Sequence, residues 1–307
     1  MGTIMNIAIY DIDVNTAKSA INEAKEYIEK LENLTSAKLQ HSGLSLINSD
    51  TGENPLVVDG ELYDLLEMSS DMSKATEGAF DITLLNLAAL WSVEQKMKSE
   101  SEIHNIPSEY EIKQTLSRCG YKNLKVNNGK VWLNNDIKID LGAVAKGYAA
   151  DNAIEILKRH GVSSAILNLG GNVYVLGKNK NSNWSVGITD PLNPSEICAI
   201  IKTSDKAVVT SANYERYFEI NGKRYHHIFD SRTGYPAESG IISVTVIGDS
   251  STLCDMLSTA FFVMGAEKAA KFKEKHKIDV DYIIINKEGE HILSEGFSLE
   301  YEKPLKK

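Results

Sequence analysis

Residues 137–161 read IKIDLGAVAKGYAADNAIEILKRHG, a stretch that places a strand directly before a helix. Alternating apolar side chains in the first four residues predict the strand, and helical spacing predicts a helix from Tyr148 to His160, closed by a glycine. Asp140, two glycines and Lys146 lie around the junction. Exposed backbone N–H and C=O groups at such a junction can bind a phosphate or a metal ion, although an ordinary helix start has the same spacing.

The segments before this junction are mostly helical. Residues 36–55 are polar and rich in Ser, Asn and Gly, so we expect a loop there, and the charged residues 94–107 are predicted to be a surface excursion. Asn15 or Thr16 is expected to cap the first helix and Asp59 the second. The predicted elements are a strand over 4–10, helices over 17–31, 62–72, 84–91 and 108–119, and a hairpin turn at 127–129.

The segments after the junction are mostly strands. Strand runs punctuated by a few helices, instead of strict alternation of strands and helices, predict an α+β fold. The sequence has no internal repeat and no clear linker, so we expect a single domain over residues 1–307, either undivided or built from two closely packed subdomains. The predicted strands are 164–169, 172–176, 184–188, 197–202, 206–210, 215–220, 223–228, 241–247, 281–286 and 291–294, and the predicted helices cover 251–264 and the residues up to 275.

The charge balance excludes several classes of partner. The 307 residues include 33 Lys and Arg against 42 Asp and Glu, which gives a formal net charge of −9. A non-specific nucleic-acid binder needs a basic stripe that neutralises phosphates, and a protein held on anionic lipid by charge alone needs a basic patch. We therefore expect no nucleic-acid partner and no purely electrostatic membrane binding.

The cysteines and the apolar runs exclude further classes. Cys119, Cys198 and Cys254 are odd in number and far apart, which argues against a disulfide framework and against a C-x-x-C metal or redox site. No apolar run approaches the roughly 18 residues that span a bilayer. Residues 1–10 lack the basic and apolar regions of a signal peptide, so we expect an exported form to have lost its leader.

Four common signatures of catalytic or nucleotide sites are absent from the sequence. These are the phosphate loop G-x-x-x-x-G-K-[ST], the dinucleotide fingerprint G-x-G-x-x-G, the zinc motif H-E-x-x-H and the nucleophile elbow G-x-S-x-G. Gly170 and Gly171 do not have the spacing of the dinucleotide fingerprint. A nucleotide that binds this chain must use a less common geometry.

A histidine pair precedes a polar turn in the stretch HHIFDSRTGYP, residues 226–236. His227 lies three residues before Asp230, a spacing that suits a general base with an orienting partner. The Arg-Thr-Gly that follows adds groups able to bind phosphate. The alternative is a surface turn with one packed histidine.

Two further segments each allow a functional and a structural interpretation. Asp255 and Thr259 are four residues apart in an otherwise apolar predicted helix, so they share a face, and their oxygens suit Mg²⁺. The alternative is a helix-start Asp and a packed Thr. Phe80 follows a small-residue break and can stack on a flat ring system or simply fill a helix corner.

Taken in this order, these segments resemble the ApbE family, the FAD:protein FMN transferases. The resemblance covers nearly the whole chain, from its first residues to the helix that carries Asp255 and Thr259. It implies an ApbE-like α+β fold with mixed, largely antiparallel sheets flanked by helices. The matching stretches are SLIN (45–48), GAFD (78–81), DLGAVAKGYAAD (140–151), NLGG (168–171), TSANYERY (210–217), HIFDSRTGYP (227–236) and DMLST (255–259).

The resemblance implies an enzyme that cleaves FAD with Mg²⁺ and releases AMP. The FMN group would be attached through a phosphoester to a Thr or Ser of an acceptor flavoprotein. His227 would be the catalytic base, and Mg²⁺ would be bound by the backbone carbonyl of Ala143 and the side chains of Asp255 and Thr259. The flavin-nucleotide site would use Met1, Ala79, Phe80, Asp81, Asp140, Lys146 and His227.

Two other functions use the same residues. One is a Mg²⁺-dependent FAD pyrophosphatase that forms FMN and AMP with water as the acceptor, and the other is a non-catalytic FAD-binding protein. His227, Asp255 and Thr259 favour catalysis, since storage requires neither a base nor a metal. The expected location is extracytoplasmic, with membrane anchoring only through a leader or anchor absent from this chain, and a cytoplasmic location is the alternative. The acceptor, the oligomeric state and the physiological cation are left open by the sequence.

Overall fold

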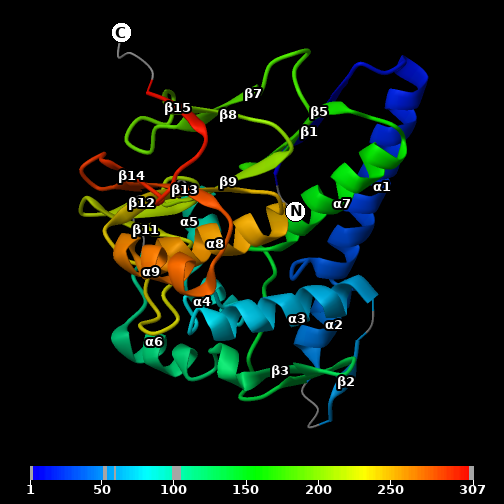
Figure 1. The fold of residues 1–307 in the computed structure, drawn as a ribbon. Coiled ribbons are helices and arrows are strands. Elements are labelled where there is room, and N and C mark those ends of the chain that lie inside the picture. The colour runs from blue at the N-terminus through cyan, green and yellow to red at the C-terminus, as the bar shows by residue number, and fades with distance from the viewer. Residues whose placement is uncertain (1–2, 51–53, 59, 99–104, 304–307) are drawn as a thin grey trace.

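A seven-stranded antiparallel sheet forms the centre of the molecule (Figure 1). The computed structural model describes residues 3–50, 54–58, 60–98 and 105–303. Every neighbouring pair of strands in the large sheet is antiparallel, which confirms the predicted α+β class with largely antiparallel sheets. In spatial order its strands are β1 (Met5–Tyr10), β5 (Ser164–Leu169), β6 (Asn172–Leu176), β9 (Lys206–Ala212), β12 (Ile241–Gly248), β13 (Asp281–Asn286) and β14 (His291–Leu293).

Three small sheets accompany the large one. Each is also antiparallel, and the Asn221-Gly222 turn closes the smallest of them as a hairpin, as predicted. The strands are β10 (Tyr217–Ile220) and β11 (Lys223–His226); β15 (Glu300–Glu302), β8 (Ile197–Thr203) and β7 (Trp184–Thr189); and β2 (Leu56–Val57), β4 (Lys130–Leu133) and β3 (Leu124–Asn127).

The helices cover the large sheet and extend away from it. In Figure 1, α1 and α7 run side by side at one end of the sheet, and α8 and α9 lie beneath it. Helices α2, α3, α4 and α6 form the lower part of the molecule with β2 and β3, whereas α5 lies higher and packs against β10. The helices are α1 (Val14–Thr35), α2 (Gly43–Ser49), α3 (Gly60–Ala75), α4 (Leu85–Trp91), α5 (Val93–Lys98), α6 (Glu109–Leu116), α7 (Ala145–Arg159), α8 (Ser251–Met264) and α9 (Ala266–His276).

The core is formed by three clusters of buried apolar side chains. The largest joins α1, α7 and α8 to one face of the large sheet, and it includes Phe261 and Phe262. A second cluster fills the space between the other face of the sheet and β7 and β8. The third surrounds Trp91, whose indole N–H donates to the carbonyl of Gly234 at 2.9 Å. This last bond ties α4 to the turn that follows the histidine pair.

Helices α7 and α8 approach each other at Gly147. A Cβ atom on Gly147 would lie 2.5 Å from the backbone oxygen of Ser251, so only glycine allows this separation. One turn further along α7, the Asp151 carboxylate accepts the backbone N–H groups of Ser251 and Thr252 at 2.7 and 2.9 Å. A carboxylate at this position satisfies free donors of the first turn of α8 and complements the helix dipole. The two residues fix the position of α8 against α7.

The structure corrects three predictions about helices. Residues 36–55 are not all loop, because Ser42 caps the short helix α2, whose Leu44 and Ile47 reach the core. The predicted excursion over 94–107 includes most of α5. Asp13, and neither Asn15 nor Thr16, caps α1, because its carboxylate accepts both of their backbone N–H groups. Asp59, the other predicted cap, lies outside the described residues.

The segment over residues 137–148, before and at the start of α7, also differs from its prediction. The residues around Lys138 form no ladder and make only an isolated bridge with Leu84. Helix α7 then begins at Ala145, three residues before the predicted start. The apolar and polar side chains alternate here because the extended chain buries Ile137 and Ile139, while the Lys138 ammonium donates to the carbonyl of Asn48. The alternation therefore does not require pairing in a sheet.

Within the described residues, no helix combines the length and the apolar character needed to cross a membrane.

Cys119, Cys198 and Cys254 are free thiols, as the sequence predicts, and Cys119 and Cys254 are buried. Burial raises the pKa of Cys119 to about 11, so this thiol stays protonated near neutral pH.

The Gly147→Ala substitution tests the contact between α7 and α8. Alanine gains up to about 1 kcal/mol over glycine in a helix interior. The added methyl group, however, meets rigid backbone of α8 at 2.5 Å, and such overpacking costs about 1–3 kcal/mol. We expect a lower free energy of unfolding by chemical denaturation. Glu155→Ala, at an exposed position of α7, is the control and should change stability by less than about 0.5 kcal/mol. A stabilised Gly147→Ala protein would contradict the close approach.

Candidate active site

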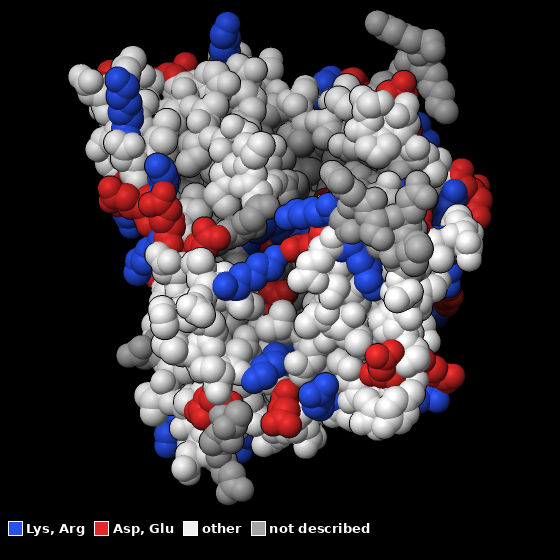
Figure 2. All heavy atoms as spheres, turned by 180° about the vertical axis from the view of Figure 1, so that it is seen from behind, with Lys and Arg blue, Asp and Glu red and all other residues white. Residues whose placement is uncertain are grey.

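A cavity of about 510 Å³ lies between the large sheet with its helices and the lower part of the molecule. Its wall combines α4 and α5 on one side with residues of β9, α7 and α8 on the other. Figure 2 shows a face that is hollowed between an upper and a lower part, with side chains of both charge signs gathered at the hollow. The volume is within the range of small-molecule sites.

The cavity brings together most of the residues that the sequence analysis selected. They come from four separate stretches of the chain, which only the tertiary fold makes neighbours. Those that line the cavity are Ala79, Asp81, Asp140, Ala143, Lys146, His227, Asp255 and Thr259.

Two selected residues do not contribute a described side chain to the cavity. Phe80 is fully buried in the main core, so its ring cannot stack on a ligand in the cavity, and the stacking hypothesis is wrong. The small residues around it let the chain turn inward, which places Phe80 at a helix corner. Met1 lies outside the described residues. The nearest described segment is Thr3, whose side chain lies against the cavity-lining Gly170.

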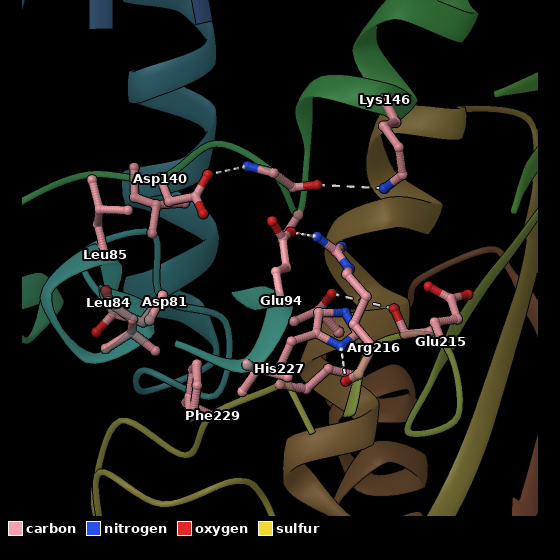
Figure 3. A pocket seen from close by; sticks show the side chains of 18 of the residues that line it. Asp81, Leu84, Leu85, Glu94, Asp140, Lys146, Glu215, Arg216, His227 and Phe229 are labelled. Carbon is pink, nitrogen blue, oxygen red and sulfur yellow. Dashed lines mark hydrogen bonds and ion pairs between the residues drawn. The ribbon is translucent and has the colours of Figure 1, made fainter. Parts of the chain in front are cut away.

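His227 is held by the backbone of Arg216. The His227 Nδ1 atom and the Arg216 carbonyl oxygen are 3.2 Å apart, and the backbone N–H of His227 donates to the same oxygen (Figure 3). A carbonyl only accepts hydrogen bonds, so Nδ1 carries the proton and Nε2 keeps its lone pair. Within the described part of the chain, Nε2 has no hydrogen-bond partner. The lone pair is therefore available to a ligand.

The surroundings keep this imidazole neutral. Burial lowers the pKa of His227 well below its ordinary value, and the positive charge of Arg216 lowers it further. The side chain is nevertheless partly accessible through the cavity. A neutral imidazole with a free nitrogen in a ligand-sized cavity can act as a general base at neutral pH.

His226 has the opposite tautomer and a structural role. Its Nδ1 atom accepts the backbone N–H of Ile228, so Nε2 carries the proton and donates to the carbonyl of Ala237, both at 3.2 Å. The ring also packs edge-on against Phe262. Both nitrogens are used and the residue is buried, so of the two adjacent histidines only His227 can serve a ligand.

Asp255 and Thr259 lie on the cavity side of α8. The Asp255 side chain is almost fully buried, and its Oδ2 atom accepts the backbone N–H of Gly147 at 2.9 Å. Its Oδ1 atom faces the Lys146 ammonium at 3.5 Å. The Thr259 hydroxyl lies 3.3 Å from the hydroxyl of Ser211 on β9. The helix contact at Gly147 therefore also sets the orientation of the carboxylate.

Asp140 and Asp81 differ in how much of each carboxylate is free. Asp140 is exposed at the cavity and its Oδ1 atom accepts the backbone N–H of Gly142 at 2.9 Å. Asp81 uses both oxygens within the protein, one for Thr83 and the other for the backbone N–H of Tyr121. Burial raises the pKa of Asp81, and these hydrogen bonds oppose the rise. Asp81 thus shapes the wall of the cavity.

The cavity also contains charged residues that the sequence analysis did not select. Arg216 lies beside His227, and Glu215 precedes it in the chain. Glu94 comes from α5, and Lys38 comes from the loop after α1. Glu215 is exposed to solvent in the cavity but has protein on most sides, which raises its pKa against the opposing charges of Lys146 and Arg216. Glu215 and Arg216 lie in the stretch TSANYERY, residues 210–217, which is one of the stretches that resemble the family, so the sequence did point to this segment. Nothing local singles out Lys38 or Glu94.

The donor set fits a metal ion that is bound together with an anionic ligand. Oxygens of Asp255 and Gly142 already converge on one cation, the Lys146 ammonium, at 3.5 and 3.4 Å. Among the described residues, no three His, Cys, Asp or Glu side chains cluster closely enough to hold a metal by themselves. Mg²⁺ is often bound by one or two carboxylates with substrate phosphate and water completing the octahedron.

The overall charge of the lining supports the same conclusion. Acidic side chains outnumber basic ones among the described lining residues, and the deficit of positive charge makes a bare diphosphate a poor ligand. A divalent cation would correct this imbalance. The acidic residues are Asp81, Glu94, Asp140, Glu215 and Asp255, and the basic residues are Lys38, Lys146 and Arg216.

Comparisons with known proteins agree with the resemblance seen in the sequence. The family model described as "ApbE family" matches residues 1–284. A protein named FAD:protein FMN transferase from Treponema pallidum is 33% identical, covering 94% of this chain and 83% of the relative. One of the same name from Klebsiella pneumoniae is 32% identical and covers 96% of this chain and 89% of the relative.

Solved structures give the same result at the level of the fold. The ApbE protein of Thermotoga maritima superposes with a TM-score of 0.84 at 33% identity, covering 95% of this chain and 94% of that structure. The flavin transferase ApbE of Vibrio cholerae has a TM-score of 0.81 at 26% identity, covering 96% and 94%. The ApbE-like fold that the sequence predicted is confirmed.

The burial of His226 predicts a pH dependence of stability. Burial lowers the pKa of His226 to about 4 in the folded protein, against about 6.5 in an unfolded chain. Between these values the unfolded state binds the extra proton, so stability falls as the pH drops from about 6.5 to about 4, by up to about 3 kcal/mol. Urea unfolding across this window should show the loss, and His226→Gln should remove it.

The matched control is His276→Gln at the exposed end of α9, which leaves both hydrogen bonds of His226 intact. This protein should keep the wild-type dependence on pH. An unchanged pH slope in His226→Gln would show that other groups are responsible.

Proposed function

The chain belongs to the ApbE family, and from this premise we propose that it cleaves FAD and transfers the FMN group to a hydroxyl of an acceptor flavoprotein, releasing AMP. The observation that carries the proposal is the free Nε2 atom of His227 in the same cavity as Asp255, Thr259 and Lys146. Phosphoryl transfer needs alignment and charge neutralisation, together with a base for the incoming hydroxyl. The cavity offers residues suited to each need.

His227 is the proposed base. Its Nε2 atom takes the proton of a Thr or Ser hydroxyl of the acceptor while the hydroxyl oxygen bonds to the phosphorus of the FMN half. The bond between that phosphorus and the bridging oxygen breaks, and AMP leaves with this oxygen. Arg216 holds the ring through its carbonyl, which keeps the reactive nitrogen directed away from the protein backbone.

Asp255, Thr259 and the carbonyl of Ala143 are the proposed ligands of Mg²⁺. Asp255 is oriented by the backbone N–H of Gly147, and Thr259 has the Ser211 hydroxyl beside it. A bound Mg²⁺ would neutralise charge on the diphosphate and on the leaving AMP. Lys146 lies next to Asp255 and would contribute a further positive charge to the same phosphate.

The flavin nucleotide is proposed to contact the cavity wall formed by Ala79, Asp81, Asp140 and Lys146. Asp140 is the exposed carboxylate of this set, which suits a hydrogen bond to ligand hydroxyls or ring nitrogens. Met1, which lies outside the described residues, is proposed as a further contact of the flavin nucleotide. The single-domain organisation and the extracytoplasmic location stay predictions.

The direct test is the intact mass of an acceptor domain that carries a Thr or Ser flavinylation motif. The domain is incubated with this protein, FAD and Mg²⁺. A gain of one FMN minus water, lost when a chelator is added, is the expected result. Free FMN and AMP without a mass gain would instead identify a pyrophosphatase. Intact FAD with two different acceptors would indicate a protein that binds FAD without reaction.

The His227→Ala protein tests the base. Removal of a positioned general base costs about 10²–10⁴-fold in rate, so transfer measured by the mass assay should fall by at least about a hundredfold. FAD binding, followed by flavin fluorescence, should change little, because Nε2 acts only on the hydroxyl proton. His226→Gln, at the neighbouring histidine that does not line the cavity, is the control. Retained transfer in His227→Ala would exclude the base role.

A further inference from the structure

Three charged side chains form a bridge across the cavity. Glu94 of α5 accepts from Arg216 Nη1 at 2.6 Å through one carboxylate oxygen and from the Lys38 ammonium through the other. Lys38 lies in the loop after α1, and Arg216 lies in the loop after β9. All three residues line the cavity, and Figure 3 shows Glu94 and Arg216 pointing toward each other beside His227. We call these three residues the Glu94 bridge.

Little free energy is needed to break the ion pairs of the Glu94 bridge. The side chains of Lys38, Arg216 and Glu94 are 78%, 41% and 33% exposed. Ion pairs with this much solvent contribute little to stability, because water can replace each partner. The two cations hold the pKa of Glu94 at about 2, against the opposing effect of burial, so the carboxylate is charged at every pH relevant to activity.

Arg216 is the member of the bridge nearest to the chemistry. Its carbonyl holds the His227 ring, and its positive charge helps to lower the pKa of that ring. The Arg216 guanidinium and the His227 ring thus line the same part of the cavity, where a phosphate that reacts with the help of His227 would bind. A guanidinium presents donors that match a carboxylate and a phosphate equally well, so Arg216 can exchange one for the other.

We propose that Arg216 and Lys38 form a phosphate-binding subsite, which the Glu94 carboxylate occupies in the free protein and which a phosphate of the flavin nucleotide takes over. This inference rests on the proposed function for the identity of the ligand. Glu94 acts as an internal competitor: it keeps Arg216 at the cavity when no ligand is bound, and it weakens phosphate binding by the strength of its own ion pairs. Release of Glu94 also moves one negative charge away from a lining that is already acidic.

The test compares two ligands that differ only in a phosphate. FMN and riboflavin share the same ring and ribityl chain, so the ratio of their dissociation constants isolates the phosphate. Both are titrated by flavin fluorescence with Mg²⁺ present and at constant ionic strength. Neither ligand can donate FMN to an acceptor from a diphosphate, so the measurement is independent of transfer activity.

In Glu94→Gln the competitor is lost, and we expect FMN to bind about two- to fivefold tighter while riboflavin is unchanged. In Arg216→Gln the donor is lost, and FMN should bind at least about tenfold weaker. In the double variant, Glu94→Gln should give a clearly smaller gain, because only the Lys38 ammonium is left to release. This non-additivity separates direct competition from a general effect of charge.

The matched control is Glu219→Gln. Glu219 is also a solvent-accessible carboxylate paired with an arginine, Arg224, but it does not line the cavity. Its removal should leave both affinities unchanged. Thermal unfolding of each variant checks that the fold is intact, and Lys38→Gln, at the most exposed position of the bridge, provides a second single variant that should weaken FMN alone.

Three results would overturn the proposal. One is weaker or unchanged FMN binding in Glu94→Gln, which would make Glu94 a support for Arg216 and not a competitor. Another is an equal gain from Glu94→Gln with and without Arg216. The third is wild-type protein that does not distinguish FMN from riboflavin. Failure of the mass assay with these affinities as expected would instead count against the proposed transfer.

Discussion

The contact between α7 and α8 at Gly147 is the constraint on which the rest of the site depends. The absence of a side chain lets the two helices touch through their backbones. The backbone N–H of Gly147, which is free because this residue lies in the first turn of α7, donates to Asp255 and orients it. Asp151 then fixes the start of α8 from the same face of α7. A carboxylate that is almost fully buried costs free energy unless it is hydrogen-bonded or paired, and this contact supplies one of its bonds. The proposed metal ligands are thus positioned by helix packing.

Electrostatic imbalance is the second property of the cavity. Its carboxylates exceed its cations, and its key imidazole is kept neutral by burial and by Arg216. Such a cavity does not suit an anion alone but suits an anion that arrives with a divalent cation. The same imbalance explains the proposed role of Glu94. When a phosphate replaces the Glu94 carboxylate on Arg216 and Lys38, one negative charge leaves the acidic lining.

The two adjacent histidines show how one sequence pattern separates into two roles. His226 is the last residue of β11, points into the core and uses both ring nitrogens, whereas His227 follows the strand, turns to the cavity and uses one. The difference arises where the strand ends, because His226 belongs to the last pair of the β10–β11 ladder and His227 lies in the bend that follows. The carbonyl that each ring meets then fixes its tautomer.

The sequence by itself determined the α+β class, most strand positions and the family, because alternation, turn signals and ordered motifs are local properties. The strands over 164–169 and 172–176 are confirmed residue for residue. It also selected His227, Asp255, Thr259 and Lys146, since each lies in a stretch of unusual composition. Only the tertiary structure decided that Phe80 fills the core and that Glu94 pairs with both Lys38 and Arg216. Burial and long-range ion pairing depend on which segments the fold brings together, and no local pattern records that.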